Sequence, residues 1–373
     1  SYDGETVFAD AQVGRLVEGL KGLGTYEPAL VVLAGDHGEG LGDHGEDTHS
    51  VFIYQSTLEV PLLVKLPGRE RAGTAVDGPA RLVDLFPTIL DVLGAGKAAP
   101  PRGLAGRSLL PSILGGTLAP APSYSESHLP FHNYGWSPLE GIQDGPFKYI
   151  HAPRAELYDL EKDPRELDNL FGRRRGEAAR LHRALLRLRE EGQDRVRARE
   201  AAREVDKETA EKLQALGYMA GGSAKPGSQT GKDPKDMWET HQEMRRANGL
   251  LARHETEKAL AAFRRLSRAD SGNPALLAAL GTALLKSGRL DEAARVFLEV
   301  RALGSLLPEG AATLGRLYLR QGKPDLAEKE AAGLIRDYPR EAAGWILQGE
   351  IFSSRGRSPE ALDAFARAQA LGD

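Results

Sequence analysis

The pentapeptide Gly-Asp-His-Gly-Glu occurs twice within twelve residues, at positions 35–39 and 42–46. In the first copy, Asp36 and His37 are adjacent and lie between glycines, which allow the backbone to approach a bound group closely. A carboxylate oxygen and an imidazole nitrogen are a common pair of ligands for a divalent metal ion. The same residues also suit a simple loop, in which Asp36 caps a turn and His37 is solvated. The repeat therefore raises the question of which copy, if either, does chemistry.

The segment before the first copy favours that copy. Residues 29–34 read ALVVLA, an uninterrupted apolar run bounded by turn residues, and this pattern predicts a strand that is buried on both faces. The first copy then lies at the carboxyl end of a buried strand, where open α/β sheets place their ligands. The second copy follows only Gly40 and Leu41 in a glycine-rich loop. We therefore expect Asp36 and His37 to be the metal ligands.

Six stretches occur in a fixed order over residues 2–170: YDGETVFADAQVGRLVEGL, LAGDHGEGLGDHGE, LEVPLLVKLPG, RLVDLFPTILDVLG, FKYI and ELYDLEKDPRELDNL. This series resembles the carboxyl-terminal half of the catalytic domain of a sulfatase, within the alkaline-phosphatase-like superfamily. The resemblance implies a partial α/β sandwich of that type over residues 1–172, and a hydrolase that contains a divalent cation. Asp36 and His37 match the Asp-Asn or Asp-His metal pair of that family. Acidic oxygen ligands favour Ca²⁺, whereas the imidazole makes Mn²⁺ or Zn²⁺ the alternatives.

The resemblance also implies a nucleophile that these residues do not supply. Sulfatases use a formylglycine made from Cys or Ser in a C/S-x-P-x-R motif, and the 373 residues contain neither that motif nor any cysteine. The chain opens almost directly in an amphipathic helix, with apolar residues at helical spacing. We therefore expect a carboxyl-terminal part of a longer protein, inactive alone, with the formylglycine upstream. Family resemblance alone favours a periplasmic or extracytoplasmic location.

Two further histidines bear on the substrate. Sulfatases place a sulfate-binding Lys shortly before the next strand, and in DTHSVFIYQSTLEVP that position matches Ser50, with His49 beside it. Phosphatases and phosphoethanolamine transferases of the superfamily carry a His in this loop. His49 is therefore the candidate catalytic and substrate-binding residue, as a general acid toward the leaving oxygen. His44, in the second copy, is a candidate for substrate binding or support of the site.

The middle of the chain predicts a sheet, a charged helix and a linker. Residues 124–164 contain short strand-like runs broken by Gly, Pro and Asp, which indicate the small antiparallel sheet that ends a sulfatase-like domain. Within that region the family resemblance makes a set of residues candidates for a pocket rim: Glu126, His128, His132 and Trp136. Residues 173–216 are charged and helical, with basic and acidic residues interleaved as on a solvated helix face. Residues 217–236 form a predicted flexible linker.

Beyond the linker, small and aromatic residues recur every 34 positions. The repeated set comprises Ala259, Ala293, Ala327 and Ala361; Ala247, Gly281, Gly315 and Gly349; and Phe263, Phe297 and Phe365. This spacing is that of a tetratricopeptide repeat, in which two antiparallel helices pack closely where Gly or Ala removes side-chain bulk. Residues 237–373 therefore predict four such repeats, an all-α solenoid whose concave face binds an extended peptide or another subunit.

Three functions from different classes follow from the sequence. The first is a metal-dependent sulfuric ester hydrolase with a repeat array for protein contacts, acting on a sulfated small molecule or glycan. The second is a phosphoester hydrolase or a phosphoethanolamine-type transferase on the same fold, with a phosphorylated substrate. The third is a non-catalytic tetratricopeptide scaffold. With a net charge of −4, no nucleic-acid partner is expected, and no membrane segment is evident.

Overall fold

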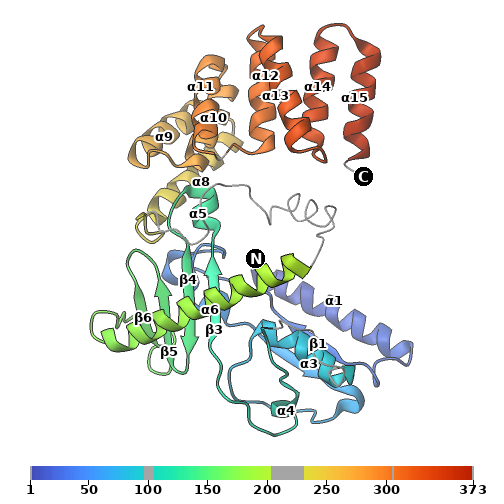
Figure 1. Ribbon diagram of the computed structural model, residues 1–373, viewed down its shortest axis with the longest axis vertical. Helices are drawn as coiled ribbons and strands as arrows, with labels where there is room; N and C mark the ends of the chain where they lie inside the picture. The colour runs from blue at the N-terminus through green and yellow to red at the C-terminus, as the bar shows by residue number, and fades with distance from the viewer. Residues whose placement is uncertain (1, 96–104, 203–230, 305, 372–373) are drawn as a thin grey trace. The chain divides into compact units, whose positions relative to one another are not determined.

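The computed structural model of the protein describes residues 2–95, 105–202, 231–304 and 306–371 (Figure 1). The chain forms two compact units. The first consists of Ser1–Ser125, Glu140–Ile150 and Ala155–Arg195, and the second of Glu126–Leu139, His151–Arg154 and Val196–Asp373. This grouping differs from the boundaries expected at residues 172 and 237, because two segments from the first half of the sequence pack with the second half.

The first unit begins with the predicted amphipathic helix, α1 (Tyr2–Gly22), none of whose residues is buried. Strand β1 (Val31–Ala34) pairs with β2 (Leu62–Lys65) in an antiparallel sheet of two strands. The prediction that residues 29–34 are buried on both faces is wrong in this structure. The opposed residues Leu33 and Leu63 remain 41% and 60% exposed, so this face of the pair is open to solvent among the residues that the structure describes.

Short helices connect and follow these two strands. The 3-10 helices are η1 (Asp43–Gly45), η2 (Pro67–Arg69) and η3 (Leu82–Asp84). The α-helices are α2 (Gln55–Leu58), α3 (Leu85–Val92) and α4 (Leu110–Ile113). Buried Asp84 stabilises the start of α3, where it pairs with Arg81 at 2.6 Å and accepts the N–H of Arg107 at 3.0 Å.

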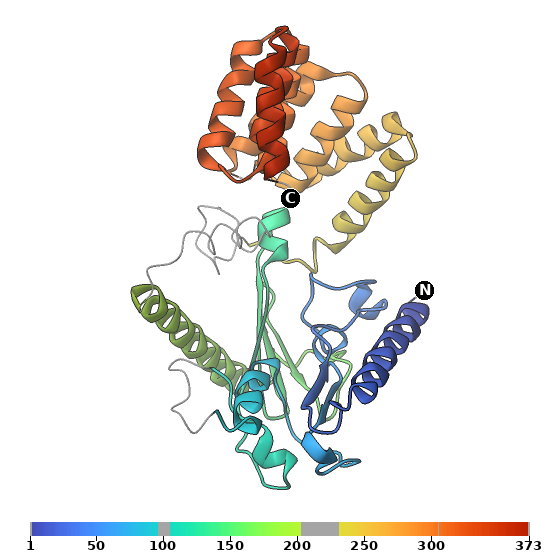
Figure 2. The same cartoon turned by 90° about the vertical axis from the view of Figure 1, so that its right-hand side faces the viewer.

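The predicted sheet of residues 124–164 is present and has four strands in the order β3–β4–β5–β6. Their bounds are β3 (Ser123–Ser127), β4 (Leu139–Asp144), β5 (Phe147–His151) and β6 (Glu156–Asp159). Helix α6 (Arg175–Ala202) lies across one face of this sheet (Figures 1 and 2). Leu181 and Leu185 of that helix are fully buried against Ile142 and Leu157, so the charged segment covers the sheet with an apolar stripe.

The second unit contains eight consecutive helices that stack in pairs (Figure 2). Their bounds are α8 (Trp238–Ala252), α9 (Thr256–Ala269), α10 (Pro274–Lys286), α11 (Leu290–Ala302), α12 (Pro308–Arg320), α13 (Pro324–Asp337), α14 (Ala342–Ser354) and α15 (Ser358–Ala370). The 34-residue period has a direct steric reason. A Cβ on Gly281 would lie 3.0 Å from the ring of Phe297, and one on Gly349 would lie 2.5 Å from the ring of Phe365. The small and the aromatic positions therefore interlock within the pairs α10–α11 and α14–α15, whereas a Cβ on Gly315 would meet Leu347 of the next pair.

The last part of the predicted linker is ordered. Residues 217–230 lie outside the described residues, as do residues 203–216 of the expected charged helix. Residues 231–236 are described, and Asp233 within them is 2% exposed. Its carboxylate accepts the N–H of Arg154 at 2.9 Å, so this hydrogen bond holds the last residues of the expected linker in place.

Helix α5 (Leu129–Tyr134) belongs to the second unit and carries part of the expected pocket rim. Trp136, which follows this helix, is fully buried in the core of the repeat array and does not line a rim. Its burial could not be read from the sequence, because the carboxylate that binds the indole, Asp270, lies 134 positions away. Among the residues that the structure describes, no helix is both long enough and apolar enough to cross a membrane.

Candidate active site

The first pentapeptide turns sharply away from the end of β1 and packs against the segment 48–57. Two glycines make this approach necessary. A Cβ on Gly38 would lie 2.2 Å from the carbonyl oxygen of Ser56, and one on Gly40 would lie 2.2 Å from that of Glu46. The Gly40 N–H donates to the Thr48 carbonyl at 2.7 Å. As a result, the loop that carries His37 lies against the loop that carries His49.

Asp36 and His37 both remain open to solvent. The Asp36 side chain is 91% exposed, and its Oδ2 lies 3.9 Å from His37 Nε2. The backbone N–H groups of Asp36 and His37 and the neighbouring imidazoles hold the pKa of Asp36 below its ordinary 3.8. Asp36 is therefore a carboxylate at neutral pH, with oxygens that are available to a cation.

The hydrogen bonds of the two imidazoles determine which nitrogens are free. His37 Nδ1 lies 2.9 Å from the Gly38 carbonyl oxygen, which can only accept a hydrogen bond. In the neutral imidazole, Nδ1 therefore carries the hydrogen and Nε2 keeps its lone pair. His49 Nδ1 lies 3.1 Å from Glu39 Oε2 in the same way. The rings of His37 and His49 lie 3.8 Å apart between centroids. Both Nε2 atoms are therefore available to a ligand or an ion.

His37, Glu39 and His49 form a group that fits a divalent cation. Each residue offers one ligand atom, and these atoms all lie within 4.8 Å of one another. Two imidazoles and a carboxylate form a common ligand set for Mn²⁺ or Zn²⁺, and the oxygens of Asp36 are next to it. Of the predicted metal ligands Asp36 and His37, only His37 belongs to this group, and His49, predicted to act on the substrate, belongs to it as well; Glu39 was not among the predicted site residues. Glu39 is the last residue of the first pentapeptide, so its position next to Asp36 and His37 could have pointed to it.

The second pentapeptide has different surroundings. His44 stacks on Tyr54 with ring centroids 3.5 Å apart, and its Nε2 donates to the Arg165 carbonyl at 3.2 Å. Asp43 pairs with the Arg165 side chain at 3.0 Å. Glu46 is 1% exposed and accepts the N–H groups of Val51 and Phe52. The contacts of this copy therefore hold the loop to its neighbours, and His44 is not in the group formed by His37, Glu39 and His49.

A buried ion pair lies behind this loop. Lys148 of β5 and Glu166 lie 2.6 Å apart, with their side chains 2% and 1% exposed. Glu166 also accepts the N–H of Gln55 at 2.6 Å. Nearby, Tyr54 donates to Glu156 of β6 at 2.9 Å. This network links the segment after His49 to the FKYI and ELYDLEKDPRELDNL stretches.

Comparison with known proteins shows which families two regions of the chain resemble. Residues 1–95 match the sulfatase family model, and residues 250–304 and 313–373 match two tetratricopeptide repeat models. The predicted combination of a sulfatase-like region with a tetratricopeptide array, and hence of an α/β part with an all-α solenoid, is confirmed.

The similar proteins are longer than this chain. An N-acetylglucosamine-6-O-sulfatase of Bacteroides thetaiotaomicron is 32% identical over 200 residues, which are 50% of this chain and 34% of that protein. The multifunctional alkaline phosphatase superfamily protein PehA of Trinickia caryophylli is 31% identical over 190 residues, 46% of this chain and 36% of that protein. A solved putative sulfatase from Bacteroides thetaiotaomicron is 27% identical with a TM-score of 0.39, covering 48% of this chain and 39% of that one. The chain thus spans about a third of the length of these curated relatives.

Proposed function

We propose that the first half of the chain is the cation-binding part of a sulfuric ester hydrolase. The observation that carries this proposal is the convergence of Asp36 and His37 with His49 at the end of β1. The match of residues 1–95 to the sulfatase family and the sulfatase relatives support it. The third function, a scaffold without catalysis, requires no such convergence of ligand-bearing side chains.

Asp36 and His37 would hold the divalent cation, and Glu39 supplies a further oxygen within reach. The cation would neutralise negative charge on the ester oxygens and on the nucleophile. Ca²⁺ is the ion expected from the acidic ligands, and the imidazoles support Mn²⁺ or Zn²⁺ instead. The orientation of His37 favours binding, because the Gly38 carbonyl holds the proton on Nδ1 and leaves Nε2 unprotonated.

His49 would act on the substrate from the other side of the cluster. Glu39 accepts the hydrogen bond from Nδ1 and so fixes the plane of the ring, which leaves Nε2 directed away from this partner. When His49 is protonated, Nε2 donates to the ester or leaving-group oxygen as a general acid. His44 would contribute only indirectly, through its stacking on Tyr54, to the shape of the loop.

We place the nucleophile outside these 373 residues. The exposed apolar surface of the first unit supports this part of the proposal. Val7 and Phe8 of α1 are 70% and 67% exposed, and Phe86 of α3 is half exposed. A two-stranded sheet is at best marginally stable alone, so β1, β2 and α1 offer apolar surface for the rest of a catalytic domain.

The proposal is tested by assaying aryl sulfate and bis-aryl phosphate substrates. Purified residues 1–373 should hydrolyse neither, because the nucleophile and part of the ligand set are lacking. The complete protein should release sulfate when its upstream sequence contains a C/S-x-P-x-R motif. Reproducible turnover by residues 1–373 alone would contradict the placement of the nucleophile.

A second candidate function is phosphoester hydrolysis or phosphoryl transfer on the same fold. The observation that favours it is His49, which contacts the ring of His37 and lies next to Ser50, the position where a sulfatase is expected to carry a sulfate-binding Lys. The similarity to an alkaline phosphatase superfamily protein is consistent with it. The two functions differ in the assay above, because phosphoryl chemistry needs a Thr or Ser nucleophile without the formylglycine motif.

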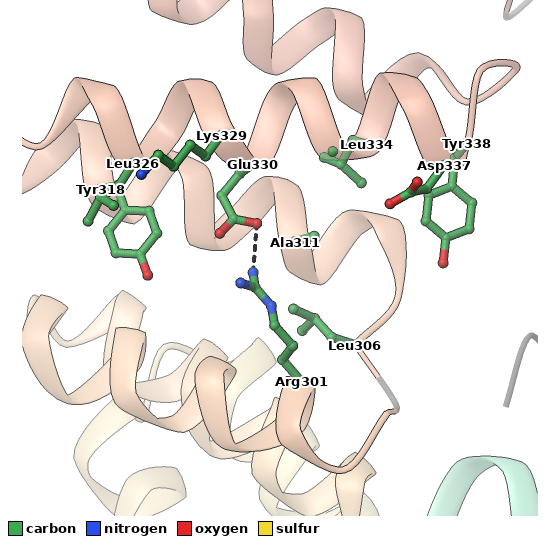
Figure 3. Close-up of a pocket in the computed structure, with 11 residues that line it drawn as sticks. Arg301, Leu306, Ala311, Tyr318, Leu326, Lys329, Glu330, Leu334, Asp337 and Tyr338 are labelled. Atoms are coloured by element: carbon green, nitrogen blue, oxygen red, sulfur yellow. Dashed lines mark hydrogen bonds and ion pairs between the residues drawn. The ribbon is translucent and has the colours of Figure 1, made fainter. Parts of the chain in front are cut away.

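The repeat array would bind a protein partner. A cavity of about 480 Å³ lies in the array among α11, α12 and α13 (Figure 3). Arg301 and Glu330 form an ion pair of 2.6 Å across it, and Tyr318 and Tyr338 also line it. An opening with charged and aromatic side chains is suited to a polar peptide segment.

A further inference from the structure

Asp270, at the carboxyl end of α9, is the centre of a buried polar cluster in the second unit. Its side chain is 1% exposed, and Lys232 Nζ lies 2.6 Å from Oδ1. Its Oδ2 accepts the indole N–H of Trp136 at 3.0 Å and the amide of Asn273 at 2.7 Å. Hydrogen bonds to a charged, buried carboxylate are among the stronger ones in proteins. A tryptophan from the sulfatase-like half of the sequence is thus held by a residue of the first repeat.

Asn273 connects this cluster to the fold of the array. It is fully buried, and its side-chain oxygen caps α10 by accepting the N–H groups of Ala275 and Leu276. The carboxylate that binds Trp136 therefore also positions the residue that starts the next helix of the array. Loss of Asp270 or of Asn273 is therefore expected to affect both the binding of the Trp136 indole and the start of α10.

Packing around the indole is extensive. Tyr134 stacks on Trp136 with ring centroids 4.4 Å apart and meets His241 of α8 edge-on at 5.3 Å. Both aromatic residues belong to the same buried core as Phe263 and Leu276 of the array. The segment 129–137 thus contributes to the hydrophobic core of the first repeat.

A second attachment lies at Arg154, in the other segment of the sulfatase-like half that joins this unit. The Arg154 N–H donates to buried Asp233 at 2.9 Å, and its carbonyl accepts from Lys235 Nζ at 3.0 Å. The Arg154 side chain pairs with Asp236 at 2.7 Å. The residues just before α8 are therefore fixed to the sheet hairpin independently of Trp136.

We propose that the first tetratricopeptide repeat is an intramolecular receptor for the segment 129–137, with Asp270 binding Trp136. The first repeat then fixes helix α5, together with the neighbouring His128 and His132, within the second unit. The surface of the first repeat that contacts Trp136 is occupied and is not open to an external peptide. This inference depends on contacts within the second unit alone and stands or falls independently of the proposed hydrolase.

Hydrogen exchange of the full chain, measured by mass spectrometry, tests the proposal. We expect Asp270→Ala to speed amide exchange over residues 129–137 by about tenfold or more, because the indole loses its charged acceptor. Trp136→Phe keeps an aromatic ring but removes the N–H donor, and should speed exchange at the junction of α9 and α10. Asp337→Ala is the matched control, since it removes a carboxylate at the end of α13 that pairs only locally, with Arg336.

Reciprocal effects of the two substitutions, absent in the control, would support the receptor. Exchange over 129–137 that is unchanged by Asp270→Ala, with a folded array by circular dichroism, would overturn it. If Asp270→Ala unfolds the array, the test rests on amide exchange at the α9–α10 junction in Trp136→Phe. A normal exchange rate at the α9–α10 junction in that variant would equally contradict the proposal.

Discussion

The two copies of the pentapeptide Gly-Asp-His-Gly-Glu, at residues 35–39 and 42–46, have different roles because their surroundings in the fold differ. In the first copy the last residue, Glu39, is partly exposed and bonds the imidazole of His49. In the second copy the last residue, Glu46, is buried and binds backbone N–H groups, and burial raises its pKa. The first copy therefore presents side chains outward, and the second uses them to close its own loop.

At the residue scale, we predict that Glu39 contributes to cation binding. Titration of the full chain with Mn²⁺ or Zn²⁺ by calorimetry should show affinity reduced by about tenfold or more in Glu39→Gln, since the variant loses a carboxylate that orients His49. Asp43→Asn in the second copy is the control and should bind as the original chain does. An equal reduction in both variants would remove the distinction between the two copies.

The buried pair of Lys148 and Glu166 gives a second prediction. Lys148→Met should lower the free energy of unfolding by about 3–5 kcal/mol, because it leaves Glu166 buried without a counter-charge. Lys21→Met, which breaks the pair with Glu18 between two exposed side chains, should cost about 1 kcal/mol or less. Urea unfolding curves of the two variants measure the difference, and similar losses would show that burial of the Lys148 pair has no energetic consequence.

The candidate site could be predicted from sequence only in part. The sequence predicts Asp36, His37 and His49 because their residue types and spacing follow a family pattern, and their roles stay predictions. Glu39 was not predicted because the same residue ends both pentapeptides, and in the second copy that residue, Glu46, has a structural role. Only the packing of Gly38 and Gly40 against neighbouring carbonyls places the two copies in different surroundings. Trp136 was assigned to a pocket rim, since nothing near it in the sequence indicates its bond to Asp270.

At the scale of elements, the periodicity of the sequence predicts the helices of the repeat array well, but the apolar pattern of residues 29–34 does not predict how deeply that strand is buried. The 34-residue repeat reflects contacts within and between adjacent helix pairs, such as Gly281 with Phe297, so it is visible in the sequence itself. The strand at residues 31–34 is present as predicted, but it is not buried on both faces. Burial of a strand depends on the elements that pack against it, and the apolar pattern of the strand itself does not show whether they are present. The order in residues 231–236 was also missed, because it arises from the distant Arg154.

The histidine between Tyr134 and Trp238 gives a prediction for the array. Burial, with a smaller contribution from Arg245, lowers the pKa of His241 below its ordinary 6.5. The folded state therefore binds this proton less readily than the unfolded chain. Stability from this source is fully present above pH 6.5 and is lost as pH falls through the lowered pKa.

Thermal unfolding of the full chain, followed by circular dichroism between pH 7.5 and 5, checks this prediction. The unfolding temperature should fall with decreasing pH, and His241→Phe should reduce that fall. His254→Phe, at an exposed turn after α8, is the control and should leave the pH dependence unchanged. A pH dependence that is identical in all three proteins would contradict the role given to His241.

At the scale of the whole molecule, the chain joins a sulfatase-like region to a tetratricopeptide array. Segments 126–139 and 151–154, from the first half of the sequence, belong to the compact unit that contains the array. The apolar surface of α1, β1 and β2 remains exposed in the other unit.

The measurement that tests the account most directly is sulfate release from an aryl sulfate by the complete protein, comparing Asp36→Ala with Asp43→Ala. Asp36→Ala should lower kcat/KM by about a hundredfold or more, because it removes a cation ligand. Asp43→Ala should retain most of the activity, because it breaks only a partly exposed ion pair with Arg165. Equal losses in the two variants would contradict the assignment of the first pentapeptide as the active one.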